Sequence, residues 1–131
     1  KANPRGNGLE WFAVVDNRSK TAITNYAKGT NTVFFTPNNE PIPFGNIVTT
    51  LMNDMSGMFL GVTAFNQFIG SWDTSNVTNM QWTFDAASTF NQPIGLWNTS
   101  KVTNINQIFD YCFKMNKYNI DNFNFCLIMN I

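Results

Sequence analysis

The chain has 131 residues and no formal net charge, and only 12% of its residues are charged. It lacks the basic excess with which proteins neutralise a phosphate backbone, so we expect no nucleic-acid partner. Because 44% of the residues are hydrophobic and 15% are aromatic, the composition predicts one folded domain with a substantial core rather than a disordered chain.

Histidine is absent, which removes the side chain that most often serves as a general base or metal ligand. The two cysteines, Cys112 and Cys126, cannot form a zinc site by themselves, and they leave a disulfide open without requiring one. No apolar run reaches the length of a membrane span, and no signal peptide is recognisable. We therefore expect no metal, no cofactor and no membrane span in this chain.

The first 42 residues predict a small antiparallel sheet. Residues 10–15 (EWFAVV), 20–26 (KTAITNY) and 32–36 (TVFFT) are the three candidate strands, and turn-forming residues separate them. The expected role of this sheet is to cover the first unit of the repeats that follow, because stacked repeats need ends that shield their core.

Two copies of one 25-residue unit occupy residues 55–79 and 80–104. The first copy reads MSGMFLGVTAFNQFIGSWDTSNVTN, and the second reads MQWTFDAASTFNQPIGLWNTSKVTN. Aromatic, amide and threonine positions therefore recur at a fixed spacing. A repeat of this length predicts a stacked architecture in which each unit closes the core of its neighbour.

Degenerate copies of the repeat flank the two clear ones. The predicted division is a β-rich N-terminal cap at 1–42 and a repeat array at 43–131, with degenerate units at 43–54 and 105–131. Ile120 and Phe123 match Ile94 and Trp97 at an offset of 26, which indicates one inserted residue in the last unit. The segment 113–131 is either a C-terminal cap or the start of a continuing array.

Each unit predicts one short strand followed by one short helix. Residues 65–72 (FNQFIGSW) have strand-like composition, residues 73–75 (DTS) offer N-cap side chains, and Val77, Met80 and Phe84 follow at i, i+3 and i+7. The predicted fold class is an α+β repeat, a leucine-rich-repeat-like solenoid of parallel short strands and short helices, whose units span about 20–29 residues. The predicted buried columns contain Phe59, Phe65, Ile69, Trp72, Val77, Met80, Phe84, Phe90, Ile94, Trp97, Val102, Ile105 and Phe109.

The strings FNQ-x-I-x-x-W-[DN]-T-S-x-V-T-N-[MI], beginning at Phe65 and Phe90, and MSGMF, beginning at Met55, carry a family resemblance. They resemble the BspA-like leucine-rich repeats, whose signature is also catalogued as a domain of unknown function in mycoplasma surface lipoproteins. The resemblance covers residues 44–130. It implies a curved parallel solenoid at a cell surface or in a secreted protein, with a role in adhesion or in binding host macromolecules, and no catalytic residue carries over from it.

Residues between the buried strand positions are the candidates for contact with a partner. On a solenoid they lie near the strand face, which is the usual binding surface. Asn66, Asn91 and Asn116 are expected to form an internal amide ladder instead. The candidate binding residues are Gln67, Phe68, Gln92, Lys117 and Tyr118, together with Trp82, which lies off the repeat core register and is expected to be exposed.

Other polar residues have more ordinary interpretations. Asp85 and Asp110 recur after the helix-end phenylalanine, and we expect solvated carboxylates rather than a cation site. Cys112 occupies the position of Val62 and Ala87, which predicts a small buried residue. The remaining carboxylates show no pairing suited to acid–base chemistry, so we expect no enzyme.

Together these features predict a non-enzymatic protein-binding or adhesion module exposed at a surface. The alternative is a structural component, such as a minor coat or scaffold protein of a virion or surface layer. The expected partners are host surface macromolecules in the first case and neighbouring subunits in the second. The expected location is the cell surface, the medium or a virion. Function should be sought in residues that differ between copies and at the two ends.

Overall fold

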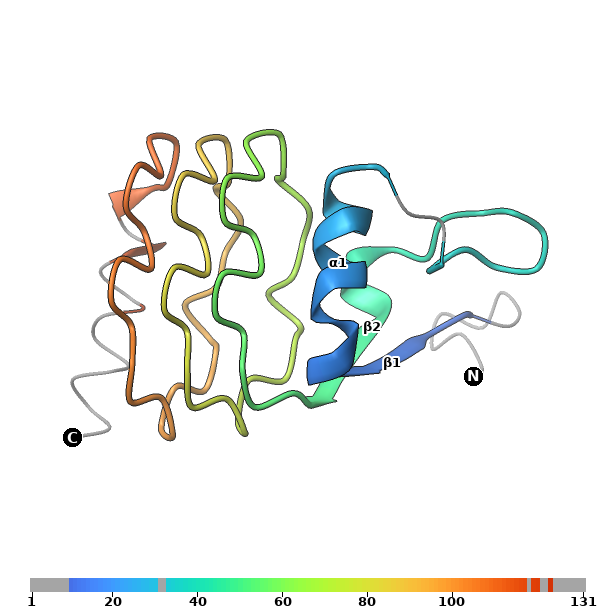
Figure 1. The fold of residues 1–131 in the computed structure, drawn as a ribbon, viewed down its shortest axis with the longest axis horizontal. Coiled ribbons are helices and arrows are strands. Elements are labelled where there is room, and N and C mark those ends of the chain that lie inside the picture. Colours follow the sequence, from blue (N-terminus) through green and yellow to red (C-terminus); the bar gives the residue numbers. More distant parts are fainter. Residues whose placement is uncertain (1–9, 31–32, 118, 121–122, 124–131) are drawn as a thin grey trace.

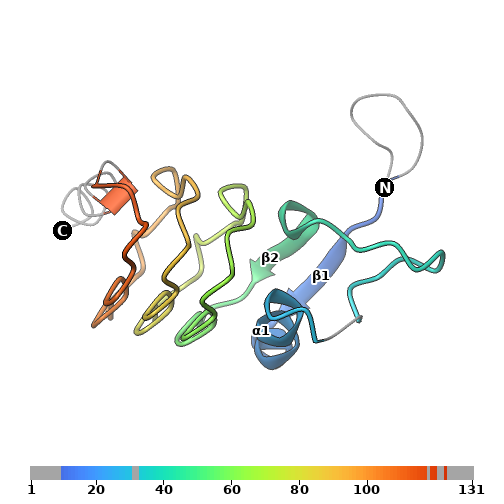
Figure 2. The ribbon, with the colours of Figure 1, turned by 90° about the horizontal axis from the view of Figure 1, so that it is seen from above.

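In a computed structural model of the protein, the structure describes residues 10–30, 33–117, 119–120 and 123. The elements in chain order are β1 (Ala13–Asp16), the 3-10 helix η1 (Asn17–Ser19), α1 (Lys20–Ala27), the 3-10 helix η2 (Phe44–Asn46) and β2 (Ile47–Leu51). After β2 the chain winds through successive coils that lie side by side, with α1, β1 and β2 at one end of the row (Figures 1 and 2). We call residues 55–79 coil 1, residues 80–104 coil 2 and residues 105–117 coil 3.

The N-terminal sheet differs from the predicted antiparallel arrangement. β1 pairs in parallel with β2, and Ala13 lies opposite Ile47. Of the third predicted strand, the described residues form one isolated antiparallel bridge, between Phe35 and Pro41. Residue 32, where that strand was predicted to begin, lies outside the described residues.

The second predicted strand, at 20–26, is wrong, because Lys20–Ala27 is the helix α1. Its sequence alternates only weakly, and the helix-start signal immediately before it decides the conformation. The Asp16 carboxylate accepts a hydrogen bond from Arg18 N, and Asp16 N donates to Ser19 Oγ, which together form a capping box. The buried Ile23 and the partly buried Tyr26 then lie one turn apart on the face that packs against the core.

The chemistry of helix termination is also complete. Gly29 N donates to Tyr26 O and Thr30 N donates to Asn25 O, the paired bonds of a Schellman motif. Gly29 has the left-handed backbone (φ 75°) that this motif places just after the helix. Gly29 therefore marks the end of a helix, whereas a strand had been predicted to end near this point of the chain.

The predicted short helix of each unit is a pair of consecutive β-turns. In coil 1 the turns are 55–58 and 59–62, closed by Met58 N to Met55 O (3.2 Å) and Val62 N to Phe59 O (3.0 Å). Their first and last residues, Met55, Met58, Phe59 and Val62, are buried at i, i+3, i+4 and i+7. This is the burial spacing of an amphipathic helix, which explains the wrong prediction. The predicted strand at 65–72 has no strand assignment either.

Each of these turns has a left-handed residue at its third position, as a type II turn requires. Coil 1 uses Gly57 and Gly61 there, whereas coils 2 and 3 place side chains in the same conformation. The non-glycine residues at these positions are Trp82 (φ 58°), Ala86 (φ 57°), Gln107 (φ 55°) and Tyr111 (φ 57°).

The left-handed turn positions predict opposite effects on stability for two reciprocal substitutions. Gly57→Ala should lower the free energy of unfolding by about 1 kcal/mol, and Ala86→Gly should raise it by a similar amount. A Cβ at Gly57 would meet nothing within 4 Å, so backbone conformation alone should determine the effect. Urea denaturation of both variants checks this. If both substitutions changed the free energy of unfolding in the same direction, the turns would differ from this description.

Backbone hydrogen bonds join the coils at the spacing of the repeat. Met55 N, Gly57 N, Phe59 N and Gly61 N donate to the carbonyls of residues 79, 81, 83 and 85 at 2.8–2.9 Å. Parallel bridges link Asp54 to Asn79 and Asn79 to Asn104. The remaining amides of these turns bond locally, so each coil is closed internally and joined to the next one along its turn segment.

A continuous aromatic core fills the coils. Phe59 stacks on Phe65 within coil 1 (ring centroids 4.2 Å apart), Phe84 stacks on Phe90 within coil 2 (4.4 Å), and Phe65 lies parallel to Phe90 between coils (5.6 Å). The Trp72 and Trp97 indoles donate to the carbonyls of Phe44 and Ile69, one coil earlier. The side chains of the predicted columns that are buried are Phe59, Phe65, Ile69, Trp72, Val77, Met80, Phe84, Phe90, Ile94 and Trp97.

The predicted columns are less completely buried from Val102 onward. Val102 and Phe109 are only partly buried, and Ile105 is 37% exposed, contrary to the predicted column. Its equivalents Met55 and Met80 have 0% exposure because another coil covers each of them. Among the described residues, no further coil covers Ile105.

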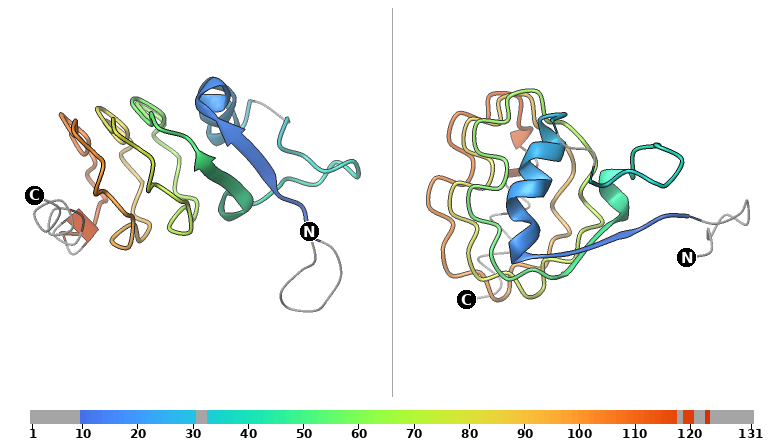
Figure 3. Two further views of the ribbon diagram at one scale, coloured as in Figure 1. Left: turned by 90° about the horizontal axis from the view of Figure 1, so that it is seen from below. Right: turned by 45° about the vertical axis from the view of Figure 1, so that its right-hand side comes forward.

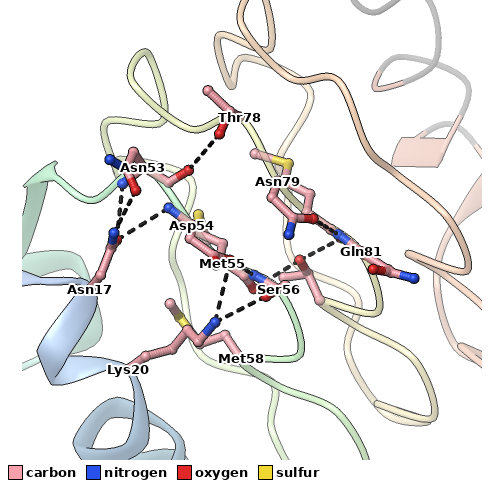
Figure 4. Close-up of polar contacts among 12 residues, drawn as sticks. Asn17, Lys20, Asn53, Asp54, Met55, Ser56, Met58, Thr78, Asn79 and Gln81 are labelled. Carbon is pink, nitrogen blue, oxygen red and sulfur yellow. Dashed lines mark hydrogen bonds and ion pairs between the residues drawn. The ribbon is translucent and has the colours of Figure 1, made fainter.

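The first coil is covered by α1, whose axis crosses the end of the row in Figure 3. Thr24 Oγ1 donates to Met58 O (2.6 Å), and Asn17 Oδ1 accepts from Asn53 N (3.0 Å). Lys20 Nζ lies 3.3 Å from Asp54 Oδ1 and 3.0 Å from Ser56 Oγ (Figure 4). A cap over the first coil was expected, but a helix provides it rather than the predicted β-rich segment.

Candidate protein-binding surface

The structure brings Gln67, Gln92 and Lys117 into one column across the three coils, but their environments differ. Gln67 and Lys117 are exposed, whereas Gln92 is half-buried and its Nε2 donates to Asn66 O (3.0 Å). Gln92 thus joins coil 2 to coil 1. Tyr118, which was predicted to lie beside Lys117, is outside the described residues.

The predicted amide ladder beside this column is confirmed. Asn91 N donates to Asn66 Oδ1 (2.9 Å), and Asn116 N donates to Asn91 Oδ1 (2.7 Å). Each asparagine side chain thus satisfies the backbone of the following coil, which the coil-to-coil ladder of the turn segment does not reach. These asparagines hold the coils in register.

Phe68 is 49% exposed, and its ring covers two glycines. A Cβ built at Gly70 would lie 2.9 Å from Phe68 Cε2, and one at Gly45 would lie 3.5 Å from Phe68 Cδ1. The Gly70 Cβ would also meet Pro93 O at 2.5 Å, so glycine is required there for the close approach of coil 2. Phe68 is accessible, but its ring also packs against the backbone of its own coil at Gly70 and of η2 at Gly45.

Trp82 is 40% exposed, as predicted, and it lies on the turn segment rather than beside Gln67 and Phe68. Its Nε1 donates to Gln107 Oε1 at 2.7 Å. Both residues occupy the left-handed position of equivalent turns, so this bond ties together two strained positions of coils 2 and 3. The five predicted binding residues that the structure describes therefore do not form one continuous surface.

The most exposed aromatic pair is one that the sequence analysis missed. Tyr111 is 65% exposed and Phe113 is 77% exposed, and their rings contact each other edge-on with centroids 6.2 Å apart. Both lie on coil 3, which also exposes Ile105. Large apolar side chains held next to each other at a surface are typical of protein-binding sites, where rigid aromatic groups supply most of the contact energy.

Comparison of the copies would have revealed this pair. At the two corresponding positions, coil 1 has Gly61 and Thr63, and coil 2 has Ala86 and Ser88. Coil 3 thus replaces small or polar residues with aromatic ones where burial does not require them. Contact candidates were predicted only at the strand positions and at Trp82, so these two positions were not compared between the copies.

Cys112 is a buried free thiol whose Sγ donates to Phe84 O. Its burial confirms the expectation from Val62 and Ala87, while Cys126 lies outside the described residues. Burial is the main cause that raises the pKa of this thiol to about 11, and the nearby charges of Asp85 and Asp110 add to the shift. The thiol therefore stays protonated and unreactive at neutral pH.

The raised pKa predicts a pH dependence of stability. The pKa of the thiol is about 9.0 in the unfolded chain and about 11 in the folded one, so its contribution to stability is complete below pH 9 and is lost as the pH rises through 11. Between pH 8.5 and 10.5 the free energy of unfolding should fall more steeply for the wild type than for Cys112→Ala. Urea denaturation across this range measures the difference, and parallel curves would contradict the shift.

Two features are absent from the described residues. No cluster of three or more cysteine, aspartate or glutamate side chains in this part of the chain is arranged to hold a metal ion. None of the helices among these residues has the length and apolar character needed to cross a membrane.

Comparison with known proteins yields one match. The sequence model of a family described as "Mycoplasma protein of unknown function, DUF285" matches residues 28–131. No curated protein and no solved structure matches the chain.

Proposed function

Because the chain belongs to the DUF285 family of Mycoplasma proteins of unknown function, we propose that it is a non-enzymatic binding module displayed at a cell surface. Its target would be a protein outside the cell, such as a host surface macromolecule. The observation that supports this most strongly is the exposed Tyr111–Phe113 pair on coil 3. A buried aromatic core supplies a rigid support on which such a pair can be presented.

We also propose that the stacked coils belong to the leucine-rich-repeat class of solenoids. The parallel bridges at a 25-residue spacing and the recurring asparagine ladder support this assignment. The coils replace the short helix of that class with consecutive turns, which suits short units with glycine or strained residues at the turn corners.

Adhesion of coated particles tests the proposed function. Fluorescent beads carrying the wild-type protein should adhere to cultured animal epithelial cells, and excess soluble protein should inhibit them. The double variant Tyr111→Ala/Phe113→Ser introduces the residues that coil 2 has at the same positions, so it should fold normally. Adhesion should fall by about tenfold or more, because aromatic anchors dominate interfaces.

Leu96→Ser is the matched control, because Leu96 is 97% exposed on coil 2 and away from the aromatic pair in the sequence. It should adhere like the wild type. Equal adhesion by beads carrying the double variant and the wild type would contradict the proposed role of coil 3. Absence of saturable adhesion by the wild type would contradict the surface-binding function itself.

The second candidate function is a structural subunit of a larger assembly. One observation favours it: the 37% exposure of Ile105, at a position that a neighbouring coil covers completely in coils 1 and 2. Sedimentation over a wide range of protein concentrations tests it. Reversible association that Ile105→Asp abolishes would support the assembly, and a monomer at all concentrations would argue against it.

A further inference from the structure

The hydrogen bonds between coils run in one direction along their turn segments. From coil 1 to coil 2, the donors are the amides of residues 55, 57, 59 and 61, and the acceptors are the carbonyls of residues 79, 81, 83 and 85. From coil 2 to coil 3, the amides of Met80, Trp82, Phe84 and Ala86 donate to the carbonyls of residues 104, 106, 108 and 110. An ordinary parallel strand pair exchanges bonds in both directions.

The type II turns explain this polarity for the amides of their third residues, which are Gly57, Gly61, Trp82 and Ala86. The left-handed third residue of each turn orients the central peptide across the plane of the turn, so its N–H faces the following coil and its carbonyl faces the preceding one. The peptide dipoles therefore add along the stack, as they do in a helix, with partial positive charge at the coil 3 end.

The two ends of the stack differ in how their backbone groups are hydrogen-bonded. At the coil 1 end, Thr24 of α1 donates to Met58 O, and the Lys20 ammonium lies beside Asp54 and Ser56. Burial alone would raise the pKa of Asp54, but hydrogen bonds from Ser56 and the Lys20 charge lower it overall. On the carbonyl edge of coil 1, Met58 O is thus hydrogen-bonded by α1, and the Lys20 ammonium binds the side chains of Asp54 and Ser56.

At the coil 3 end, no described residue accepts a hydrogen bond from the amides equivalent to Met80, Trp82, Phe84 and Ala86. These amides belong to Ile105, Gln107, Phe109 and Tyr111, which we call the donor row. Exposed Ile105 and Tyr111 side chains lie at its two ends, and the partly buried Phe109 lies between them. The row thus combines apolar surface with four amides that have no hydrogen-bond acceptor among the described residues.

We propose that the donor row is a docking edge for another protein that presents the carbonyl edge of a coil with this same repeat. Such an edge offers four carbonyls at two-residue spacing and no competing amide, which complements the row completely. An ordinary strand would bring its own amides against positions where coil 3 has no outward carbonyl. A second copy of this chain does not fit, because α1 covers its carbonyl edge.

This inference goes beyond the proposed adhesion to a host macromolecule and names a second class of protein that coil 3 would bind. It continues the interface that already joins coils 1, 2 and 3, with a phenylalanine of the partner expected to extend the stack of Phe84 on Phe109, whose rings are 5.9 Å apart. It predicts heterologous, head-to-tail association that stops at a capped end.

Hydrogen exchange followed by NMR gives the first test. In the isolated full chain, the donor-row amides should exchange at least tenfold faster than those of Met80, Trp82, Phe84 and Ala86. A peptide with the sequence of residues 78–97 contains the residues whose carbonyls form this edge in coil 2. It should slow exchange of the donor row tenfold or more, whereas a peptide of reversed sequence should not.

Protection of the donor row in the isolated protein would overturn the proposal, because the chain itself would then occupy the edge. Equal effects of the two peptides, or binding that leaves the row unprotected, would also overturn it. If adhesion still depends on Tyr111 and Phe113 in that case, the proposed function survives and only the docking edge is wrong.

A full-chain probe removes the dependence on peptide folding. The variant Lys20→Glu/Thr24→Glu places carboxylates against the carbonyls of coil 1 and should release α1. Alone, it should form oligomers that grow with concentration, and an equimolar amount of wild-type protein should shorten them, because each wild-type chain that docks ends an oligomer. A variant that stays monomeric with the near-UV circular dichroism of folded coils would overturn the proposal, and if the variant unfolds, the peptide result decides.

Discussion

Phe84→Ala should lower the free energy of unfolding by about 3–5 kcal/mol, the usual cost of removing a buried phenylalanine. Phe84 has 0% exposure and its ring contacts those of Phe59, Phe90 and Phe109 at 4.4–5.9 Å. It therefore joins all three coils. Since domains of this size are stable by about 5–15 kcal/mol, the variant should lie near the limit of folding.

Urea denaturation at 25 °C measures this effect, with Phe113→Ala as the matched control. Phe113 is the same residue type but is 77% exposed, so its loss should change stability by less than about 0.5 kcal/mol. Phe84→Leu should lie between the two, because it keeps apolar volume but loses the ring contacts. Equal costs at positions 84 and 113 would show that the aromatic core is not packed as described.

Ile23→Ala should have the second-largest effect, a loss of about 2–5 kcal/mol. Ile23 is completely buried and holds α1 against the core. Its truncation should loosen α1 and expose the carbonyl edge of coil 1, so the amide protons of residues 20–27 should exchange faster before the coils themselves open. Hydrogen exchange combined with thermal unfolding measures both effects.

Thr21→Ala controls for helix propensity, because Thr21 is exposed on the same helix. It should leave stability unchanged or raise it by a few tenths of a kcal/mol, at most about 0.7, since alanine is the better helix former. Unchanged exchange in α1 of the Ile23→Ala variant would contradict the role of Ile23 as the residue that anchors the cap.

The repeat register was predictable because the buried positions carry the same residues in successive copies of the repeat. Ile69 and Ile94, and likewise Trp72 and Trp97, are identical in both clear copies and are all buried. The backbone conformation was not predictable from the same pattern. Consecutive turns and an amphipathic helix both bury residues at i, i+3, i+4 and i+7, and only Gly57 and Gly61 in coil 1 distinguished the turns.

The N-terminal segment was mispredicted for a related reason. Residues 20–26 are short and only weakly periodic, so the capping box at Asp16 and the Schellman end at Gly29 are better guides than alternation. The partnership of β1 with β2 depends on contacts distant in sequence, which no local pattern specifies.

The candidate site was predictable only in part. Exposure of Trp82 and the asparagine ladder followed from the register, whereas Tyr111 and Phe113 required a comparison of positions outside the strand face. The donor row had no sequence signal, because the direction of backbone hydrogen bonds depends on turn conformation. Tyr111 and Gln107 adopt left-handed conformations that their residue types disfavour.

The central claim is that coils of 25 residues are equivalent units stacked in register. Deletion of residues 80–104 removes one whole coil and joins Asn79 to Ile105, which restores the junction between Asn104 and Ile105. This variant should fold and unfold cooperatively, at a lower temperature than the wild type because one coil interface is lost. Deletion of residues 80–99 removes fewer residues but breaks the register, so the near-UV circular dichroism and the cooperative transition should both disappear. Similar behaviour of the two deletions would contradict the account.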